Sequence, residues 1–445
     1  MKTRRKIYAM ILLLCVIASP ALAATLHVGP GQDYDRIEAA LAAAGPGDRI
    51  LVHPKPENAP YEGVALYITQ PEIHIQAVGS PDAHIPLSGA GFVYSGRGST
   101  PRAIVQFNRG ADGGVLEGFA LYGAHNESHN GAGVRINQAN DVTIRNCYIH
   151  GNDMGIMSNG DGTPDTARNQ RIVDCLIYEN GSHEDPGFNH NLYLGGDSVT
   201  VQGCEIHSSL TGHNIKSRAH RTEVIACYIH NSANRELDLV DGAGDTTRPG
   251  SDAWLVGNVV VKSPSGSGNR GVIHFGQDGG HNHIGTIYLV HNTIVTPYIS
   301  PVILLSAPGA RTALYNNIVW DAGRPQANQV LVQHSLGADP ETVLRGAGNW
   351  LAQGFAAGLR DTAMLENSHF GKRGEVLPFV GAEAGDYRLD APYSTLAGQG
   401  SALPESLRDA LQDVLGENLL SFTHPVGSSA RPERQPPDIG AYAAP

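Results

Sequence analysis

The chain has 445 residues, of which 31 are basic and 43 are acidic, for a formal net charge of −12. Hydrophobic residues make up 41% of it, enough for a sizeable core, which excludes a globally disordered chain. Its 54 glycines and 27 prolines exceed average usage and favour many short strands joined by turns. Because binding to nucleic acid or to an anionic membrane would need a basic patch, the acidic balance disfavours both as partners.

The first residues predict a signal peptide. A positively charged start is followed by an apolar run over residues 9–18 and by small residues that fit cleavage after Ala23. Cleavage would change the net charge from −12 to −16, because this segment carries four cations and no acid. The apolar run is shorter than the ~20 residues needed to span a membrane. We therefore expect a secreted or periplasmic protein with no membrane contact after cleavage, and a monomer.

Seven segments of the chain repeat a short apolar pattern around a cysteine or an asparagine. Successive markers are 23 to 34 residues apart, which is the spacing of solenoid repeats. An aliphatic residue follows each marker by two positions, so this column must face one continuous core. Each repeat then reads as about three short parallel strands, and stacking the repeats gives a parallel β-helix. The markers are Cys147, Cys175, Cys204, Cys227, Asn258, Asn292 and Asn317.

The marker column has its own predicted chemistry. The asparagines suit a ladder at a tight αL-type turn, because asparagine tolerates that conformation and its amide can bond its neighbours. Disulfides between in-register parallel strands are geometrically awkward. We therefore expect the four cysteines to be reduced, buried thiols stacked in the same column.

This repeat pattern resembles the right-handed parallel β-helix proteins of the pectate lyase-like superfamily, over most of the mature chain. The N-terminal stretch is typical of that group: Asp35 and Glu38 predict a capping box for a short helix that closes the open end of the solenoid. The predicted organisation is a signal peptide, an N-terminal strand with a capping helix, the parallel β-helix, and an irregular C-terminal cap, over residues 1–23, 24–49, 50–333 and 334–445.

A second short strand follows the loop after each marker strand, and its alternation predicts which side chains face outward. Leu192, Ile215, Leu237 and Ile273 are expected inside. The predicted outward positions form one column of Asn191, Asn214 and Glu236 and a second column of Tyr193, Lys216, Asp238 and His274. Arg218 lies one step along, and His190, His213 and Arg235 lie at the strand entrances. This face is interpreted as a functional groove, the alternative being a solvated charged surface.

The residues of this face suit β-elimination on a uronate-containing glycan. That reaction needs a base for the C5 proton, a group that neutralises the adjacent carboxylate, and a proton donor for the leaving oxygen. We expect Lys216 to be the base, Arg218 or Asn214 to hold the carboxylate, and Tyr193 or His190 to donate the proton. The remaining substrate contacts are expected from Asn191, His213, Arg235 and His274.

Three acidic residues of the same stretch predict a cation site. Glu236, Asp238 and Asp241 offer hard oxygen ligands of the kind that Ca²⁺ prefers. A Ca²⁺ ion there would neutralise the substrate carboxylate.

Residues 214–242 resemble the catalytic segment of chondroitinase B-type and alginate lyases. The Lys-Ser pair of that segment is present at Lys216 and Ser217, but its Arg-His-Gly reads Val240-Asp241-Gly242 here, so a second catalytic cation would have to come from Arg218 or Arg235. The resemblance implies a lyase that cleaves an acidic polysaccharide. A noncatalytic carbohydrate-binding or surface protein, and a glycan hydrolase or epimerase, are the alternatives.

Overall fold

The protein is described here from a computed structural model, which describes residues 23–98, 101–264, 271–297, 301–326, 329–338, 340–356, 365–416, 418–432 and 434–444. The predicted signal peptide, apart from Ala23, lies outside these residues. Within them, no helix is long and apolar enough to cross a membrane.

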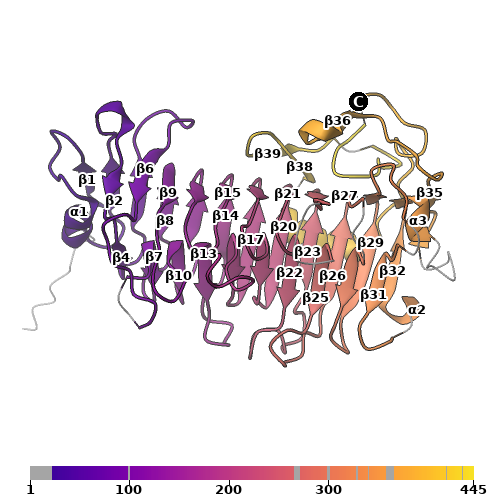
Figure 1. Cartoon of the computed structure of the whole chain (residues 1–445), viewed down its shortest axis with the longest axis horizontal. Coiled ribbons are helices and arrows are strands. Elements are labelled where there is room, and N and C mark those ends of the chain that lie inside the picture. The colour runs from indigo at the N-terminus through magenta and orange to yellow at the C-terminus, as the bar shows by residue number, and fades with distance from the viewer. Residues whose placement is uncertain are drawn as a thin grey trace, which may run out of the picture.

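The chain folds as a right-handed parallel β-helix, as its repeats predict. Three long parallel sheets, here called A, B and C, run along the molecule, and each complete coil contributes one strand to each sheet in the order A, B, C. Figure 1 shows the strands stacked along the long axis with helix α1 at one end. Since every strand pairs with its counterpart in the next coil, residues a full coil apart in sequence lie about 4.8 Å apart in space.

In the repeats, the strands of sheet A lie just before the marker residues. Its strands are β1 (Thr25–Val28), β2 (Arg49–Val52), β5 (His74–Ala77), β8 (Val115–Glu117), β11 (Thr143–Arg145), β14 (Gln170–Val173), β17 (Ser198–Gln202), β20 (Arg221–Ile225), β23 (Ala253–Val256), β26 (Thr286–Val290), β29 (Arg311–Tyr315), β32 (Leu344–Ala347) and β34 (Leu365–Glu366).

Sheet B begins directly after the markers. Its strands are β3 (Tyr61–Glu62), β6 (Ile85–Ser88), β9 (Phe119–Tyr122), β12 (Tyr148–His150), β15 (Leu176–Tyr178), β18 (Glu205–His207), β21 (Tyr228–His230), β24 (Val259–Val261), β27 (Thr293–Val295), β30 (Ile318–Trp320), β33 (Trp350–Leu351) and β35 (His369–Phe370).

Sheet C follows the variable loops and carries the predicted groove. Its strands are β4 (Leu66–Ile68), β7 (Ala103–Asn108), β10 (Ala132–Asn137), β13 (Met154–Asn159), β16 (Leu192–Leu194), β19 (Ile215–Ser217), β22 (Leu237–Val240), β25 (Ile273–Gly276), β28 (Ile303–Leu305) and β31 (Val332–His334).

The core is the column of aliphatic side chains that the three sheets enclose. On sheet C, Leu192 pairs with Ile215, Ile215 with Leu237, and Leu237 with Ile273. All four side chains are fully buried, which confirms the predicted inward positions.

The marker column forms the predicted ladder at the turn between sheets A and B. The amide of Asn258 donates to Asn292 Oδ1 at 3.0 Å, and Asn292 donates in turn to Asn317 Oδ1 at 2.9 Å. The left-handed conformation belongs to the residue before each marker, for example His291 with φ 55°. This turn aims the marker side chain along the helix axis, where it satisfies backbone groups of the neighbouring coils.

The N-terminal helix covers the open end of the solenoid but is not capped as predicted. Helix α1 (Ile37–Ala43) buries Ile37 and Ala40, and its N-cap residue Arg36 makes no side-chain capping bond. Glu38 instead accepts a hydrogen bond from the backbone of Ala65 at 3.2 Å. The predicted capping box is therefore wrong, because the Glu38 carboxylate bonds the next coil and not the N-terminus of helix α1.

The coils also continue past the predicted boundary at residue 333. Strands β32 and β34 extend sheet A, and β33 and β35 extend sheet B, so partial coils reach Phe370. The marker ladder continues there, because Asn317 donates to Asn349 Oδ1 at 2.9 Å, but β33, β34 and β35 have only two residues each and show no periodicity. The remaining elements are η1 (Pro56–Asn58), α2 (Pro340–Val343), α3 (Gln353–Ala356), β36 (Phe379–Gly381), η3 (Ala382–Ala384), β37 (Asp386–Leu389), α4 (Glu405–Leu415), β38 (Leu420–Phe422) and β39 (Ser428–Ala430).

The C-terminal segment returns along the outside of the solenoid, as Figure 1 shows in yellow. Leu407 and Leu411 of α4 pack on Trp254 and Val290 of sheet A. The backbone of Gly427 donates a hydrogen bond to Gly203 O at 2.7 Å. This segment therefore stabilises the outer side of sheet A and leaves sheet C to the loops.

The four cysteines of the coils are free and fully buried. The Cys175 amide donates to Cys204 Sγ at 3.4 Å, as part of the same ladder. We predict four titratable thiols when the mature chain (residues 24–445) is denatured without reductant and treated with a thiol reagent. Two or fewer thiols would show that disulfides form across the coils.

Candidate functional site

A column of four polar side chains runs across the outer face of sheet C. Backbone pairing sets Tyr193 beside Lys216, Lys216 beside Asp238, and Asp238 beside His274. The column is covered and not freely solvated: the Lys216 side chain is 11% exposed and that of Asp238 only 2%. A plain solvated face is thus a poor description of it.

Asp238 is the centre of this column. Its Oδ1 lies 2.8 Å from both Arg235 Nη1 and His274 Nδ1. Its Oδ2 lies 3.1 Å from Lys216 Nζ and 3.4 Å from His213 Nε2. Burial opposes the charge, but the hydrogen bond from His274 and the nearby cations hold the pKa of Asp238 well below its usual value. The carboxylate is therefore ionised and fixed in place.

Two stacked histidines form one wall of the site. The rings of His190 and His213 lie 5.0 Å apart with planes 17° from parallel. Each Nδ1 accepts a backbone N–H, from His213 at 3.0 Å and from Arg235 at 3.2 Å respectively. Burial lowers the pKa of His213 to about 4 and that of His190 well below its usual value. Both rings are consequently neutral at pH 7, with the proton on Nε2.

Lys216 and Arg218 converge on a single carboxylate. Asp278 Oδ2 lies 2.8 Å from Lys216 Nζ and 2.6 Å from Arg218 Nη2. Arg218 also donates from Nε to the Tyr193 hydroxyl at 3.1 Å. Burial tends to raise the pKa of Asp278, but these cations lower it overall. The pair of cations thus forms a carboxylate-binding position, occupied here by the protein's own side chain.

Asp241 anchors the loop that carries Asp278. Its carboxylate accepts backbone N–H groups from Asp278, from Gly279 at 2.7 Å and from His281 at 2.6 Å. These bonds lower its pKa against the effect of burial. Asp241 is therefore a structural anchor of the loop, and its oxygens are engaged by backbone donors.

The predicted outward column of Asn191, Asn214 and Glu236 is wrong. All three side chains are fully buried in a ladder at the turn between sheets B and C. Asn191 donates to Asn214 Oδ1 at 2.9 Å, and Asn214 donates to Glu236 Oε2 at 2.6 Å. The period-two alternation fails here because these residues precede the strands, where the chain is still turning.

The ladder ends in a buried ion pair that the sequence pattern did not indicate. Lys262 Nζ lies 3.6 Å from Glu236 Oε1, and both side chains are fully buried. Burial raises the pKa of Glu236 to about 7, and Lys262 opposes this shift. The ion pair explains why Glu236 takes a position that asparagine holds in the neighbouring coils. Its carboxylate neutralises the Lys262 amine, which enters from the next coil.

The three predicted Ca²⁺ ligands do not form a cation site. Glu236 belongs to the interior ladder, Asp238 is surrounded by cationic and imidazole groups, and Asp241 is occupied by backbone donors. A Ca²⁺ site needs six to eight oxygen ligands around one point. These residues do not fit that requirement.

The structure therefore sorts the predicted site residues into two sets. It brings together Lys216, Arg218, Tyr193, Asp238, His190, His213, Arg235 and His274. It places Asn191, Asn214 and Glu236 in the interior and Asp241 under a loop. Sequence reasoning missed Asp278, because this residue follows a strand in a loop with no periodicity, and only its Asp-Gly-Gly sequence marked a turn.

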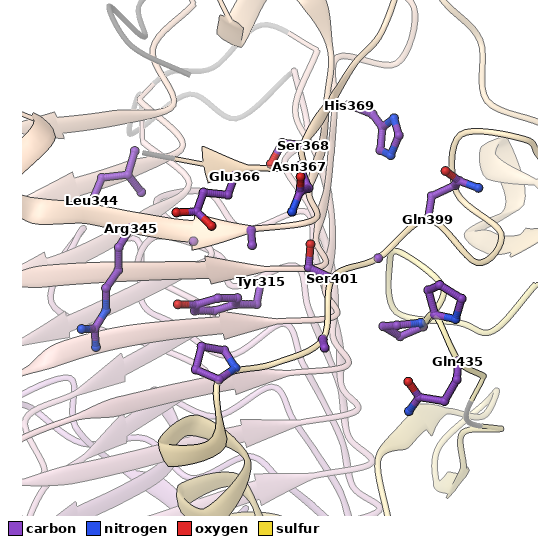
Figure 2. A pocket seen from close by; sticks show the side chains of 17 residues that line it. Tyr315, Leu344, Arg345, Glu366, Asn367, Ser368, His369, Gln399, Ser401 and Gln435 are labelled. Atoms are coloured by element: carbon purple, nitrogen blue, oxygen red, sulfur yellow. The ribbon is translucent and has the colours of Figure 1, made fainter. Parts of the chain in front are cut away.

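A wide pocket lies away from this cluster, at the C-terminal end of the solenoid (Figure 2). It has a volume of about 1420 Å³ and is lined by the ends of sheet A and by the returning C-terminal segment, including Tyr315, Arg345, Glu366 and Gln435. Figure 2 shows these labelled side chains well separated around the opening. Because no ion pair joins them among the described residues, we place the chemistry at the sheet C cluster.

A second histidine group lies on sheet B. One ligand atom each of Glu205, His207 and His230 lies within 4.8 Å of the others. The two rings are stacked, with centroids 4.8 Å apart and planes 12° from parallel, and Tyr178 continues the stack. In stacked rings the nitrogen lone pairs point in parallel directions and do not converge on one ion. The arrangement indicates a structural role for this ring stack.

Comparisons with known proteins give structural likenesses only. No protein-family model matches the chain, and no curated protein matches it significantly in sequence. Among solved structures, it is similar to pectate lyase Pel9A, with 13% identity over 95% of this chain and 96% of that one and a TM-score of 0.46. It is also similar to pectin methylesterase PemA from Erwinia chrysanthemi, with 11% identity over 78% and 93% and a TM-score of 0.37. At these values, neither likeness decides what the chain does.

The buried pair predicts the effect of Glu236→Ala. Removing the carboxylate leaves Lys262 buried without its counter-charge, so we expect a loss of about 3–5 kcal/mol in the free energy of unfolding. Chemical denaturation followed by circular dichroism measures it. Glu62→Ala, an exposed control on β3, should change stability by less than about 0.5 kcal/mol. A stable Glu236→Ala variant would contradict the buried ladder.

Proposed function

We propose that the protein is a secreted polysaccharide lyase that cleaves an acidic, uronate-containing glycan by β-elimination at the sheet C cluster. The observation that carries this proposal is the convergence of Lys216 and Arg218 on the Asp278 carboxylate. A uronate presents the same chemical group as Asp278. Substrate binding would therefore exchange one carboxylate for another at a preformed position.

The bound carboxylate would also be stabilised during the reaction. When the C5 proton leaves, negative charge develops on the carboxylate as an enolate-like state, and fixed cations bind that charge more strongly than the ground state. Arg218 is suited to this role, because the guanidinium fork matches a carboxylate and is always charged. Its own position is fixed by Tyr193 and by the backbone of Asp241.

In this scheme, Lys216 removes the C5 proton and Tyr193 donates a proton to the leaving oxygen. C5 is bonded directly to the carboxylate carbon, so a base beside that carboxylate is within reach of the C5 proton. Lys216 is a cation in the resting site, so its Nζ must first give up one proton to solvent. The neutral amine then takes the C5 proton, the C5 electron pair forms the C4–C5 double bond, and the glycosidic oxygen at C4 leaves. The Tyr193 hydroxyl, held by Arg218 Nε, supplies the proton to that oxygen. Asn214 has no part in this scheme, because it lies in the interior ladder.

The remaining groups shape the site. Neutral His190 and His213 present a stacked imidazole wall, and Asp238 holds the same Lys216 amine that Asp278 contacts. The net charge of the chain is negative, so attraction of a polyanion depends on this local cluster of cations. A secreted or periplasmic location, following signal cleavage, would give the protein access to such polymers.

Substitution of Lys216 tests the proposed base. We expect Lys216→Ala to lower the rate of product formation about 10²- to 10⁴-fold, the usual contribution of a general base. Lys216→Arg keeps the positive charge but cannot act as a base at neutral pH, so it should be similarly impaired. The assay follows absorbance near 235 nm, from the unsaturated uronate, on a panel of acidic glycans.

The exposed residue Lys372 provides the matched control: Lys372→Ala should keep full activity, and thermal unfolding should confirm that each variant is folded. A Lys216→Arg variant as active as the unaltered protein would exclude Lys216 as the base. If the unaltered protein binds acidic glycans but cleaves none of them, it is a noncatalytic carbohydrate-binding protein.

A further inference from the structure

His274 links the central carboxylate to a serine on the next coil. Its Nδ1 lies 2.8 Å from Asp238 Oδ1, and its Nε2 lies 2.6 Å from Ser306 Oγ. Ser306 directly follows β28, whose residue Leu304 pairs with His274. The β-elimination scheme uses neither Ser306 nor the second nitrogen of His274.

The hydrogen bonds around Ser306 fix the direction of its proton. The Gln277 N–H donates to Ser306 Oγ at 2.7 Å, so the hydroxyl is an acceptor on that side. Its single proton can go to His274 Nε2 at 2.6 Å or to Gln277 O at 3.2 Å, and the shorter distance favours the imidazole. Asp238 accepts the other ring proton, which sets the tautomer with a free lone pair on Nε2.

A glycine permits the close approach of the serine. A side chain at Gly276 would place its Cβ 2.5 Å from Ser306 Oγ, and the φ of +147° at this position is rarely adopted by other residues. Ser306 is partly exposed, whereas His274 and Asp238 are buried beneath it. The hydroxyl thus lies at the outer end of an oriented chain of hydrogen bonds.

We propose that Ser306, His274 and Asp238 form a nucleophilic relay that hydrolyses carboxylic esters, a second activity beside the β-elimination site. The arrangement has the order that activates a serine: nucleophile, base, and an ionised carboxylate that orients the base. Asp238 acts as a positioning residue here, because it reaches the ester only through His274.

The reaction balances with water as the only co-substrate. Ser306 Oγ bonds to the acyl carbon while its proton passes to His274 Nε2. The ester C–O bond then breaks, and His274 returns the proton to the leaving alcohol oxygen. Water attacks the acyl-serine with His274 again as the base, which releases the carboxylic acid and restores the hydroxyl.

The position of the relay indicates the class of ester. Lys216 and Leu304, the residue two positions before Ser306, are three strand pairings apart on sheet C, which corresponds to about 14 Å at about 4.8 Å per step. A glycan whose uronate lies at Lys216 would then present a sugar further along its chain to Ser306. On this point the inference rests on the proposed function, and it predicts an O-acylated acidic glycan as the substrate.

The test uses probes that require no glycan, so its result is independent of the lyase assay. The full mature chain is treated with a fluorophosphonate, and the modified peptide is identified by mass spectrometry. Hydrolysis of p-nitrophenyl acetate is measured in parallel. We expect phosphonylation at Ser306, and a loss of both labelling and ester hydrolysis of at least about 10²-fold in Ser306→Ala and in His274→Gln.

Ser429→Ala, at an exposed serine on β39, is the matched control and should keep labelling and hydrolysis at their full level. Because Ser306 also bonds the Gln277 backbone, thermal unfolding of Ser306→Ala separates loss of chemistry from loss of fold. The labelling result on the unaltered protein does not depend on any variant. Absence of phosphonate on Ser306, or ester hydrolysis unchanged in a folded Ser306→Ala, would overturn the proposal and leave a structural hydrogen-bond chain.

Discussion

Registered backbone pairing between successive coils is the constraint on which the rest of the molecule depends. It converts residues 22 to 36 positions apart, such as Lys216, Asp238 and His274, into neighbours on one face of sheet C. A slip of one residue would exchange this face with the core. Two side-chain ladders at the turns, one of cysteine and asparagine and one of asparagine ending in Glu236 and Lys262, bond neighbouring coils in that register. The packing of the core thus fixes which side chains meet in the site.

The charges of the site are arranged so that each has a partner before any substrate arrives. Asp238 is matched by Lys216, Arg235 and two imidazoles, and Asp278 is matched by Lys216 and Arg218. When Asp278 leaves the two cations, another carboxylate in the same position would restore both ion pairs, whereas a neutral group would not. Under the proposed function, the site would therefore favour an anionic sugar over a neutral one.

Periodicity in the sequence was sufficient to predict the fold and the outward column of the site on sheet C. The alternation of Leu192, Tyr193 and Leu194 specified an outward tyrosine, and stacking then placed Lys216, Asp238 and His274 beside it. The same rule failed for Asn214 and Glu236, since it was extended one residue beyond the strand into a turn. Asp278 and Ser306 were out of reach, because both lie in loops where no period relates a residue to its neighbours. The contacts of Asp278 depend on how its loop returns to the sheet, and backbone donors to Asp241 hold that loop.

A crystal structure with a bound oligouronate would show whether Lys216 and Arg218 form a uronate-binding position. The variant Tyr193→Phe is suitable, because it removes the proposed proton donor and keeps both cations. With oligogalacturonate or oligomannuronate bound, we expect a sugar carboxylate within hydrogen-bond distance of Lys216 Nζ and Arg218 Nη2, with Asp278 displaced from both. Oligouronate bound elsewhere, such as in the pocket beside Arg345, with Asp278 still bridging the two cations, would contradict it.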